Sequence, residues 1–322
     1  SKSNTTFRIP ISPGLIKQVL DSKPDVLISD GFMQWTYAAL AVRALKRIPH
    51  VMCYERTAHT ERNAGRLRIW YRKIVSRWID AIDCNGILCG EYVRSLGFDS
   101  KRLTFGHMVA DISGMSRTIQ NIANEDIVKV KKELKIPPKG LMILFVGQLI
   151  PIKGVDQLLT AWKQFKSHCK ENCTLVYVGY GRLEQPLRDR IVNEKIQDVI
   201  LIGGIDYDSI AQYYKAADCF ILPTVEDNWS LVVPEAMACG LPVATTIYNG
   251  CHPELITKEN GWVFDTYNEQ SIIDTLQNIV NNKERLKEMG EVSKRIVSKH
   301  TAERAAQSIM AAIDIAQKHC KK

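Results

Sequence analysis

Short apolar runs alternate with amphipathic stretches between residues 141 and 265. The runs are rich in β-branched residues and predict strands at 142–147, 174–179, 199–203, 219–223, 242–246 and 261–264. Between them, apolar residues recur at i, i+3 and i+4 and predict helices at 155–165, 183–195, 209–217 and 231–239. Buried strands separated by such helices are typical of a parallel sheet covered on both faces. We therefore expect a doubly wound, Rossmann-like domain here.

The first third of the chain has the same pattern in a shorter form. It predicts strands at 26–29, 50–54, 81–88 and 102–105, and helices at 38–46, 65–78 and 91–96. These strands are too few for a complete doubly wound domain, so we expect a partial one. Residues 112–126 are polar and unpatterned and are predicted to form the interdomain linker. After residue 268 the chain is helical, and the stretch 301–319 is amphipathic enough to pack across a domain boundary.

These patterns predict an α/β protein with two Rossmann-like domains, the N-terminal one incomplete, and with C-terminal helices crossing back. The expected domains are residues 1–120, residues 121–300, and a helix at 301–322 that packs toward the N-terminal domain. A length of 322 residues agrees with two domains. Tandem domains of this kind usually bind ligands between the carboxyl ends of their sheets.

The charge of the chain is concentrated at one end. Residues 1–120 hold 18 Lys and Arg against 10 Asp and Glu, a net of +8, which is the net charge of the whole chain. This excess favours an anionic partner for the first third and is too mild to indicate nucleic acid. The nine cysteines are too irregular for a disulfide framework and indicate reduced thiols in a cytoplasmic protein. No apolar run reaches the length of about 18 residues that would span a bilayer.

Two sets of residues have the spacing of metal ligands. Asp206 and Asp208 form an Asp-x-Asp pair, but Asp208 is better explained as the N-cap of the helix that follows it. His168, Cys169 and Cys173 have no fourth ligand near them in the sequence. We therefore expect no metal site.

The segment 223–243 contains the strongest candidate chemistry. A strand ends at Pro223, a polar loop with Asp227 follows, and a helix is predicted to begin near Ser230, with Glu235 in its first turns. Free N–H groups at the start of such a helix, here the amides of Asn228–Ser230, can bind phosphate. A capped helix with solvated carboxylates is the ordinary alternative for one such loop taken alone.

This segment resembles the signature of retaining glycosyltransferases of the GT-B fold, in particular family 4 (glycosyl transferases group 1). In that family two Glu residues stand eight positions apart, as Asp227 and Glu235 do here, with Asp in the first place. The run Glu235-Ala-Met-Ala-Cys-Gly matches the family's Glu-Ala-(Met/Leu)-Ala-x-Gly. A second loop, from Gly147-Gln148 to Lys153-Gly154, resembles the family's phosphate-binding loop, with Gln148 where Arg is usual.

The resemblance implies a metal-independent hexosyltransferase that requires no cofactor and uses a UDP- or GDP-linked sugar as its donor substrate. Its catalytic residues would be Lys153 at the diphosphate, Asp227 at the donor sugar and Glu235 at the ribose. The weaker turn 178–181 resembles the family's Val-Gly-x-Gly, and the loop at Gly204 would lie near the base. The implied donor-binding residues are Gly147, Gln148, Gly154, Gly204, Asn228, Trp229, Ser230 and Leu231.

On the acceptor side, the resemblance places a loop after the strand 50–54, where Glu55 or His59 could assist the acceptor. The implied acceptor is a glycan or a lipid-linked glycan, as in polysaccharide or glycoconjugate synthesis. In and just before the predicted helix at 65–78, six cations interleave with aromatic residues: Arg62, Arg66, Arg68, Arg72, Lys73 and Arg77 with Trp70, Tyr71 and Trp78. A solvated basic face is the ordinary explanation. The alternative is a surface for anionic lipid headgroups or a polyprenyl-phosphate acceptor, at the inner face of a membrane.

Two other functions remain open from the sequence. The first is a donor-binding or regulatory module without catalysis, which the incomplete N-terminal domain would favour. The second is a GT-B epimerase that acts on a nucleotide sugar without any acceptor.

Overall fold

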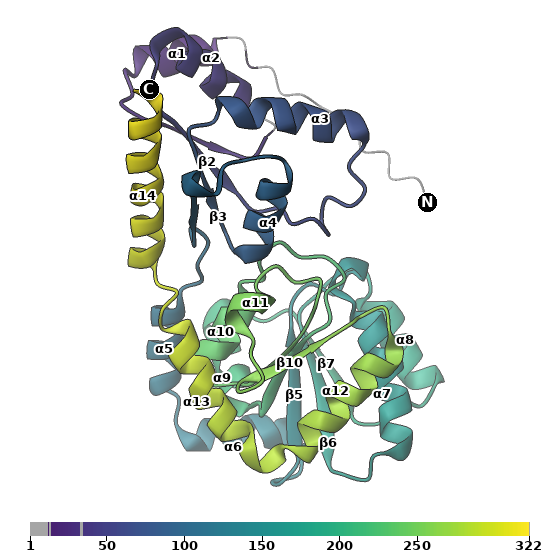
Figure 1. The fold of residues 1–322 in the computed structure, drawn as a ribbon. Coiled ribbons are helices and arrows are strands. Elements are labelled where there is room, and N and C mark those ends of the chain that lie inside the picture. Colours follow the sequence, from purple (N-terminus) through teal and green to yellow (C-terminus); the bar gives the residue numbers. More distant parts are fainter. Residues whose placement is uncertain (1–11, 13, 33–34, 322) are drawn as a thin grey trace. The chain divides into compact units, whose positions relative to one another are not determined.

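The computed structural model describes residues 12, 14–32 and 35–321. The chain divides into two compact units, coloured along the chain in Figure 1. Unit 1 consists of residues 1–108 and 303–322, and unit 2 of residues 109–302. The first boundary lies earlier than the predicted residue 120, because the segment that follows it packs within unit 2.

Unit 1 contains a parallel sheet of four strands in the order β1-β2-β3-β4. Its strands are β1 (Leu27–Asp30), β2 (His50–Tyr54), β3 (Ala81–Cys84) and β4 (Leu103–Phe105). Its helices are α1 (Leu15–Asp21), α2 (Thr36–Lys46), α3 (Arg66–Val75), the short η1 (Ser76–Trp78), α4 (Ile87–Ser95), η2 (Ser100–Arg102) and α14 (Ala302–Cys320).

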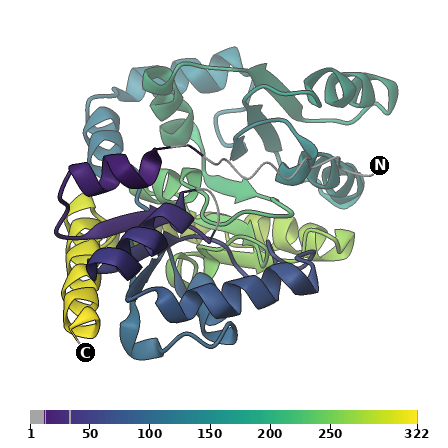
Figure 2. The same cartoon turned by 90° about the horizontal axis from the view of Figure 1, so that it is seen from above.

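Helices cover both faces of this sheet. On one face, Val51 and Ala81 pack against Ala312 and Ala316 of α14. On the other face, alternate strand residues such as Met52 join a core that includes residues of α3 and α4. Figure 2 shows α14 and α3 on opposite sides of these strands. The last helix of the chain therefore completes the fold of its first hundred residues.

Unit 2 contains a parallel sheet of six strands in the order β10-β9-β8-β5-β6-β7. The strands are β5 (Leu141–Val146), β6 (Cys173–Val178), β7 (Val199–Gly203), β8 (Cys219–Leu222), β9 (Val243–Thr246) and β10 (Gly261–Phe264). All but β7 and β10 are almost wholly buried, which explains why β5 and β8 are uninterrupted apolar runs and why β6 and β9 hold only threonine as a polar residue.

The helices of unit 2 form two groups. The crossovers between parallel strands are right-handed. A helix that leads to a strand added on one side of the sheet therefore lies on the opposite face from a helix that leads to a strand added on the other side. Accordingly α7 packs against α12, whereas α10 packs against α5 and α13, and α5 and α6 contact α9. The helices are α5 (Ile112–Gln120), α6 (Asn124–Glu133), η3 (Pro151–Lys153), α7 (Val155–His168), α8 (Glu184–Asn193), α9 (Tyr207–Ala216), α10 (Val232–Ala238), α11 (His252–Leu255), α12 (Glu269–Asn281), η4 (Lys283–Arg285) and α13 (Leu286–Val297).

Three local predictions were wrong. The expected linker at 112–126 forms α5 and the start of α6, because Ile112 and Met115 are buried against neighbouring helices. The strand predicted at 81–88 ends at Cys84, and its last residues begin α4. Helix α9 begins at Tyr207, so Asp206 rather than Asp208 is its N-cap. Within the described residues, no helix combines the length and the apolar character needed to cross a bilayer.

Candidate functional site

The order of the strands in unit 2 defines where a ligand can enter. The chain proceeds outward from β5 through β6 to β7 and then returns to add β8 on the other side of β5. The loops after β5 and β8 consequently diverge above neighbouring strands, which is the usual binding position in open α/β sheets. Lys153 follows β5, and Asp227 follows β8.

These two loops are in direct contact. Nζ of Lys153 lies 2.5 Å from Oδ2 of Asp227, and both side chains are only partly exposed. The Thr224 hydroxyl donates to the carbonyl of Ile152, and the Val225 amide donates to the same carbonyl. The ion pair therefore stands on two loops that are already bonded through their backbones.

Gly154 makes this approach possible. Its φ of +67° lies in the left-handed region, and a Cβ there would lie 1.8 Å from the carbonyl oxygen of Pro223. A side chain at this position would force apart the loops that carry Lys153 and Asp227. Gly154 therefore allows the loops after β5 and β8 to approach each other closely.

The loop that contains Asp227 is also tied to the end of β9. The Asp227 amide donates to the carbonyl of Tyr248, and the Gly250 amide donates to the carbonyl of Asp227. The other carboxylate oxygen of Asp227 accepts the Trp229 amide at 3.1 Å. Of the three amides predicted for phosphate, that of Trp229 is therefore already occupied by Asp227.

Glu235 lies in the first turn of α10, one turn beyond this loop. The hydroxyl of Tyr214, a buried residue of α9, donates to Oε2 of Glu235 at 3.2 Å. Burial raises the pKa of Glu235 to about 7, although the Tyr214 hydroxyl partly offsets the effect by stabilising the carboxylate. A carboxyl group with such a pKa is typical of functional sites. Tyr214 was not among the predicted site residues, because its position depends on how α9 packs near α10.

Two polar groups in the loop before α10 are buried without a hydrogen-bond partner among the described residues. They are Nε1 of Trp229 and Oγ of Ser230. The Trp229 ring lies 6.4 Å from the ring of His300. Buried donors are normally paired, so these two leave unused hydrogen-bonding capacity in the loop between Asp227 and α10. Leu231, by contrast, is exposed.

The remaining predicted donor residues lie at the same edge of the sheet. Gly147 and Gln148 follow β5, with Gln148 exposed, and Gly204 follows β7. A Cβ on Gly179 would lie 1.9 Å from the carbonyl oxygen of Gly147, and one on Gly181 would lie 2.4 Å from that of Leu149. The Gly-x-Gly turn therefore packs the loop after β6 against the loop after β5.

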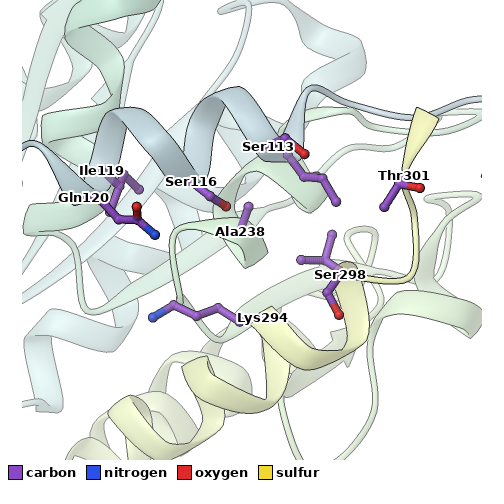
Figure 3. A pocket seen from close by; sticks show the side chains of 10 residues that line it. Ser113, Ser116, Ile119, Gln120, Ala238, Lys294, Ser298 and Thr301 are labelled. Atoms are coloured by element: carbon purple, nitrogen blue, oxygen red, sulfur yellow. The ribbon is translucent and has the colours of Figure 1, made fainter. Parts of the chain in front are cut away.

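A separate cavity of ≈ 390 Å³ lies in unit 2 among α5, α10 and α13. Figure 3 shows Lys294 and Ser298 on one wall and residues of α5 on another. The side chain of Lys294 lies against Gly240, because a Cβ added to Gly240 would lie 2.5 Å from Cε of Lys294. The ammonium group of Lys294 pairs with Glu291. The residues that line this cavity are different from those predicted to bind a donor.

In unit 1, Glu55 and His59 lie in the loop after β2, at the carboxyl end of that strand. The basic helix differs from its prediction at Arg62, which lies before the start of α3, and at Arg72. Arg72 is buried rather than on the basic face, because its guanidinium pairs with the buried Glu61 at 2.7 Å. In the described part of the chain, no three His, Cys, Asp or Glu residues are grouped to hold a metal ion.

Comparisons with known proteins agree with this arrangement. The family model for glycosyl transferases group 1 matches residues 126–296. A glycosyltransferase of Haemophilus influenzae is 32% identical over 181 residues, covering 56% of this chain and 50% of its own. A GDP-mannose-dependent monoacylated alpha-(1-6)-phosphatidylinositol monomannoside mannosyltransferase of Corynebacterium glutamicum is 28% identical, covering 52% and 45%. The matched stretch thus spans about half the length of these curated relatives.

The fold is also known from solved structures. The Anabaena HepE protein in complex with UDP aligns with a TM-score of 0.77 at 16% identity, covering 93% of this chain and 81% of its own. The predicted GT-B fold is confirmed by this likeness. With the family model matching more than half of its residues, the chain belongs to the glycosyl transferases group 1 family.

Proposed function

We propose that this chain transfers a hexose, with retention of anomeric configuration, from a nucleotide-diphosphate sugar to a glycan or lipid-linked acceptor. The observation that carries the proposal is the convergence of Lys153, Asp227 and the loop before α10 at the switch point of one sheet. The names of similar proteins support a nucleotide-linked donor, since one is GDP-mannose-dependent and another was crystallised with UDP.

Departure of the nucleotide diphosphate is the difficult step, because negative charge accumulates on the leaving group. Lys153 would place its ammonium group against that charge, and Asp227 would orient the ammonium group and contact the donor sugar. Each preorganised donor of this kind typically stabilises a transition state by about 3–4 kcal/mol. Gln148 brings no charge, so Lys153 would carry more of the stabilisation. The proposed mechanism uses no metal and no cofactor.

Glu235 would hold the ribose hydroxyls of the donor. Tyr214 donates to Oε2 and leaves Oε1 available to accept from a ribose hydroxyl. The Trp229 indole and the Ser230 hydroxyl, both buried and unpaired among the described residues, would become donors to the ligand. These groups lie on the loop between Asp227 and α10, so one bound nucleotide would satisfy them together.

Unit 1 would supply the acceptor side, with Glu55 or His59 in the loop after β2 assisting the acceptor hydroxyl. We also propose peripheral association with an anionic membrane surface, at its cytoplasmic face, through the outer face of α3. Four large side chains of α3 and η1 are exposed on that face, which we call the α3 apolar stripe: Leu67 at 81%, Trp70 at 62%, Tyr71 at 36% and Trp78 at 54%.

The α3 apolar stripe lies on the side of the helix away from the buried Arg72, and Arg66, Lys73 and Arg77 border it along one edge. Residues 62–79 contain no Asp or Glu. An aromatic face flanked by cations is typical of helices that lie in the headgroup region of a bilayer.

The proposal is tested by measuring donor binding and turnover separately. Thermal shifts with UDP-, GDP- and ADP-sugars should identify one nucleotide that raises the melting temperature. Product analysis should then show sugar transferred to an added acceptor with retained configuration. Binding without turnover would favour a regulatory module, and a changed sugar without any acceptor would indicate an epimerase.

A further inference from the structure

Three guanidinium groups surround one carboxylate in unit 1. Glu61 has a side chain that is 2% exposed, and Oε2 lies 2.7 Å from Arg72, whose side chain is also 2% exposed. Arg72 in addition donates to the Tyr92 hydroxyl at 2.6 Å and lies over the rings of Phe32 and Tyr92. Arg72 is therefore committed to the core, and it neutralises Glu61.

Two further arginines reach the same carboxylate from the surface. Nε of Arg56 lies 3.2 Å from Oε1 of Glu61, and Nη1 of Arg68 lies 3.9 Å from Oε2. Their side chains are 50% and 41% exposed. A single carboxylate cannot balance three cations, so these four groups together carry a formal charge of +2. The excess belongs to Arg56 and Arg68.

The segment that carries Arg56 is held in one conformation. The Thr57 amide donates to the Thr60 hydroxyl, the Thr60 amide donates to the Thr57 hydroxyl, and the Glu61 amide donates to the Thr57 carbonyl. Nε of Arg56 faces Oε1 of Glu61 as an ion pair without a hydrogen bond, and the guanidinium group of this half-exposed side chain is open to another acceptor. Arg68 uses one terminal nitrogen. The guanidinium fork suits the paired oxygens of a phosphate.

The place of the pair in the fold fits a substrate site. Arg56 comes two residues after β2, at the carboxyl end of the unit 1 sheet, in the same loop as Glu55 and His59. Arg68 lies in the first turn of α3, which contains no acidic residue. Anions are stabilised at such a helix start, and the two cations beside Glu61 add to that effect.

We propose that Arg56 and Arg68 bind the phosphate group of a phosphorylated ligand, with Glu61 and Arg72 holding the pair in place. This inference rests on the proposed function to the extent that the ligand is identified as the acceptor. The shared chemistry is a phosphate or diphosphate, carried either by a lipid headgroup or by a soluble sugar phosphate.

The test uses inorganic pyrophosphate as its probe, titrated by calorimetry into the Lys153→Ala protein so that the proposed donor site does not contribute. Adding Arg56→Gln and Arg68→Gln should weaken pyrophosphate binding at least tenfold. The matched control is Arg94→Gln, an exposed arginine of α4, which should leave the affinity unchanged. Equal affinities with and without the Arg56 and Arg68 changes would overturn the proposal.

Two additions keep this experiment decisive. If the double variant unfolds, Arg56→Lys takes its place, since a lysine keeps the charge, loses the fork and should weaken binding less than Arg56→Gln. Sedimentation with phosphatidylcholine vesicles, with and without phosphatidic acid, identifies the source. If phosphatidic acid increases sedimentation of the wild type but not of the double variant, the phosphate belongs to a lipid. If it increases sedimentation of both while the double variant loses pyrophosphate binding, the phosphate belongs to a soluble ligand. Neither readout involves sugar transfer, so the site and the transferase proposal can fail independently.

Discussion

The ammonium group of Lys153 and the carboxylate of Asp227 are 2.5 Å apart, although 74 residues separate them in the chain. They meet because β5 and β8 are neighbours in the sheet and their loops are bonded through Thr224 and Val225. A pair that follows two strand ends at a switch point is placed for a ligand rather than for stability alone.

Lys153→Ala should reduce transfer by at least a hundredfold while the protein stays folded. The side chain is partly exposed and pairs with Asp227, whereas loss of one preorganised cation typically costs about 3–4 kcal/mol in the transition state. Initial rates and a thermal melt measure the two effects. Lys258→Ala, which removes an exposed lysine elsewhere in unit 2, is the control. Wild-type rates in Lys153→Ala would remove Lys153 from the mechanism.

Glu235→Ala should weaken nucleotide affinity by about tenfold to a hundredfold, because each lost hydrogen bond to a charged group contributes about 1.5–3 kcal/mol. Binding of a ribose to the ionised form should also lower the pKa of Glu235 from about 7 and release a proton near neutral pH. Calorimetry in buffers with different ionisation enthalpies measures both. A nucleotide that binds both proteins equally, with no proton released, would place the ribose elsewhere.

Glu235 should also make stability depend on pH in an unusual direction. Its folded-state pKa, about 7, lies above the ordinary 4.5, so the folded protein binds the proton more tightly than the unfolded chain does. The stabilising contribution is complete below about pH 4.5 and is lost as the pH rises through 7. Relative to Glu235→Gln, the wild type should lose about 1–3 kcal/mol between pH 5 and pH 8. Urea unfolding of both proteins at these two pH values gives the difference, and parallel curves would contradict the assignment.

Gly154→Ala should destabilise the protein by more than about 2 kcal/mol, because the new Cβ would clash with the Pro223 carbonyl at a left-handed φ. Gly65→Ala is the matched control, since nothing lies within 4 Å of a Cβ at that position. Its φ is −63°, which other residues adopt freely. Urea midpoints of the two variants provide the comparison. Similar midpoints would mean that the two loops can separate without cost.

The sequence predicts this edge of unit 2 well, and the reason is physical. Buried parallel strands are continuous apolar runs, so their ends, and with them Lys153 and Asp227, can be located from the pattern alone. What the pattern does not contain is the partner of each side chain. Tyr214 reaches Glu235 only because α9 packs near α10, and Arg72 is buried only because Glu61 is buried beside it.

The predicted linker failed for a different reason. Ile112, Met115 and Ile119 do have helical spacing, but polar residues between them hid it. Their helix α5 is stabilised by contact with α9 and α10, which a local pattern cannot reveal. Element type is therefore predictable where burial is complete on both sides, and less so for a short helix with one buried face.

Trp70→Ser together with Trp78→Ser should lower binding to vesicles of phosphatidylcholine with phosphatidylserine at least tenfold, while leaving stability nearly unchanged. Both indoles are more than half exposed, so they contribute little to the core and have much apolar surface to bury in a headgroup layer. Trp35→Ser, a third exposed tryptophan of unit 1 that lies outside the α3 apolar stripe, is the control. Raising the salt concentration should weaken binding of the wild type further, because the cations flanking the stripe are screened. Equal sedimentation of all three proteins would show that α3 is a solvated basic helix.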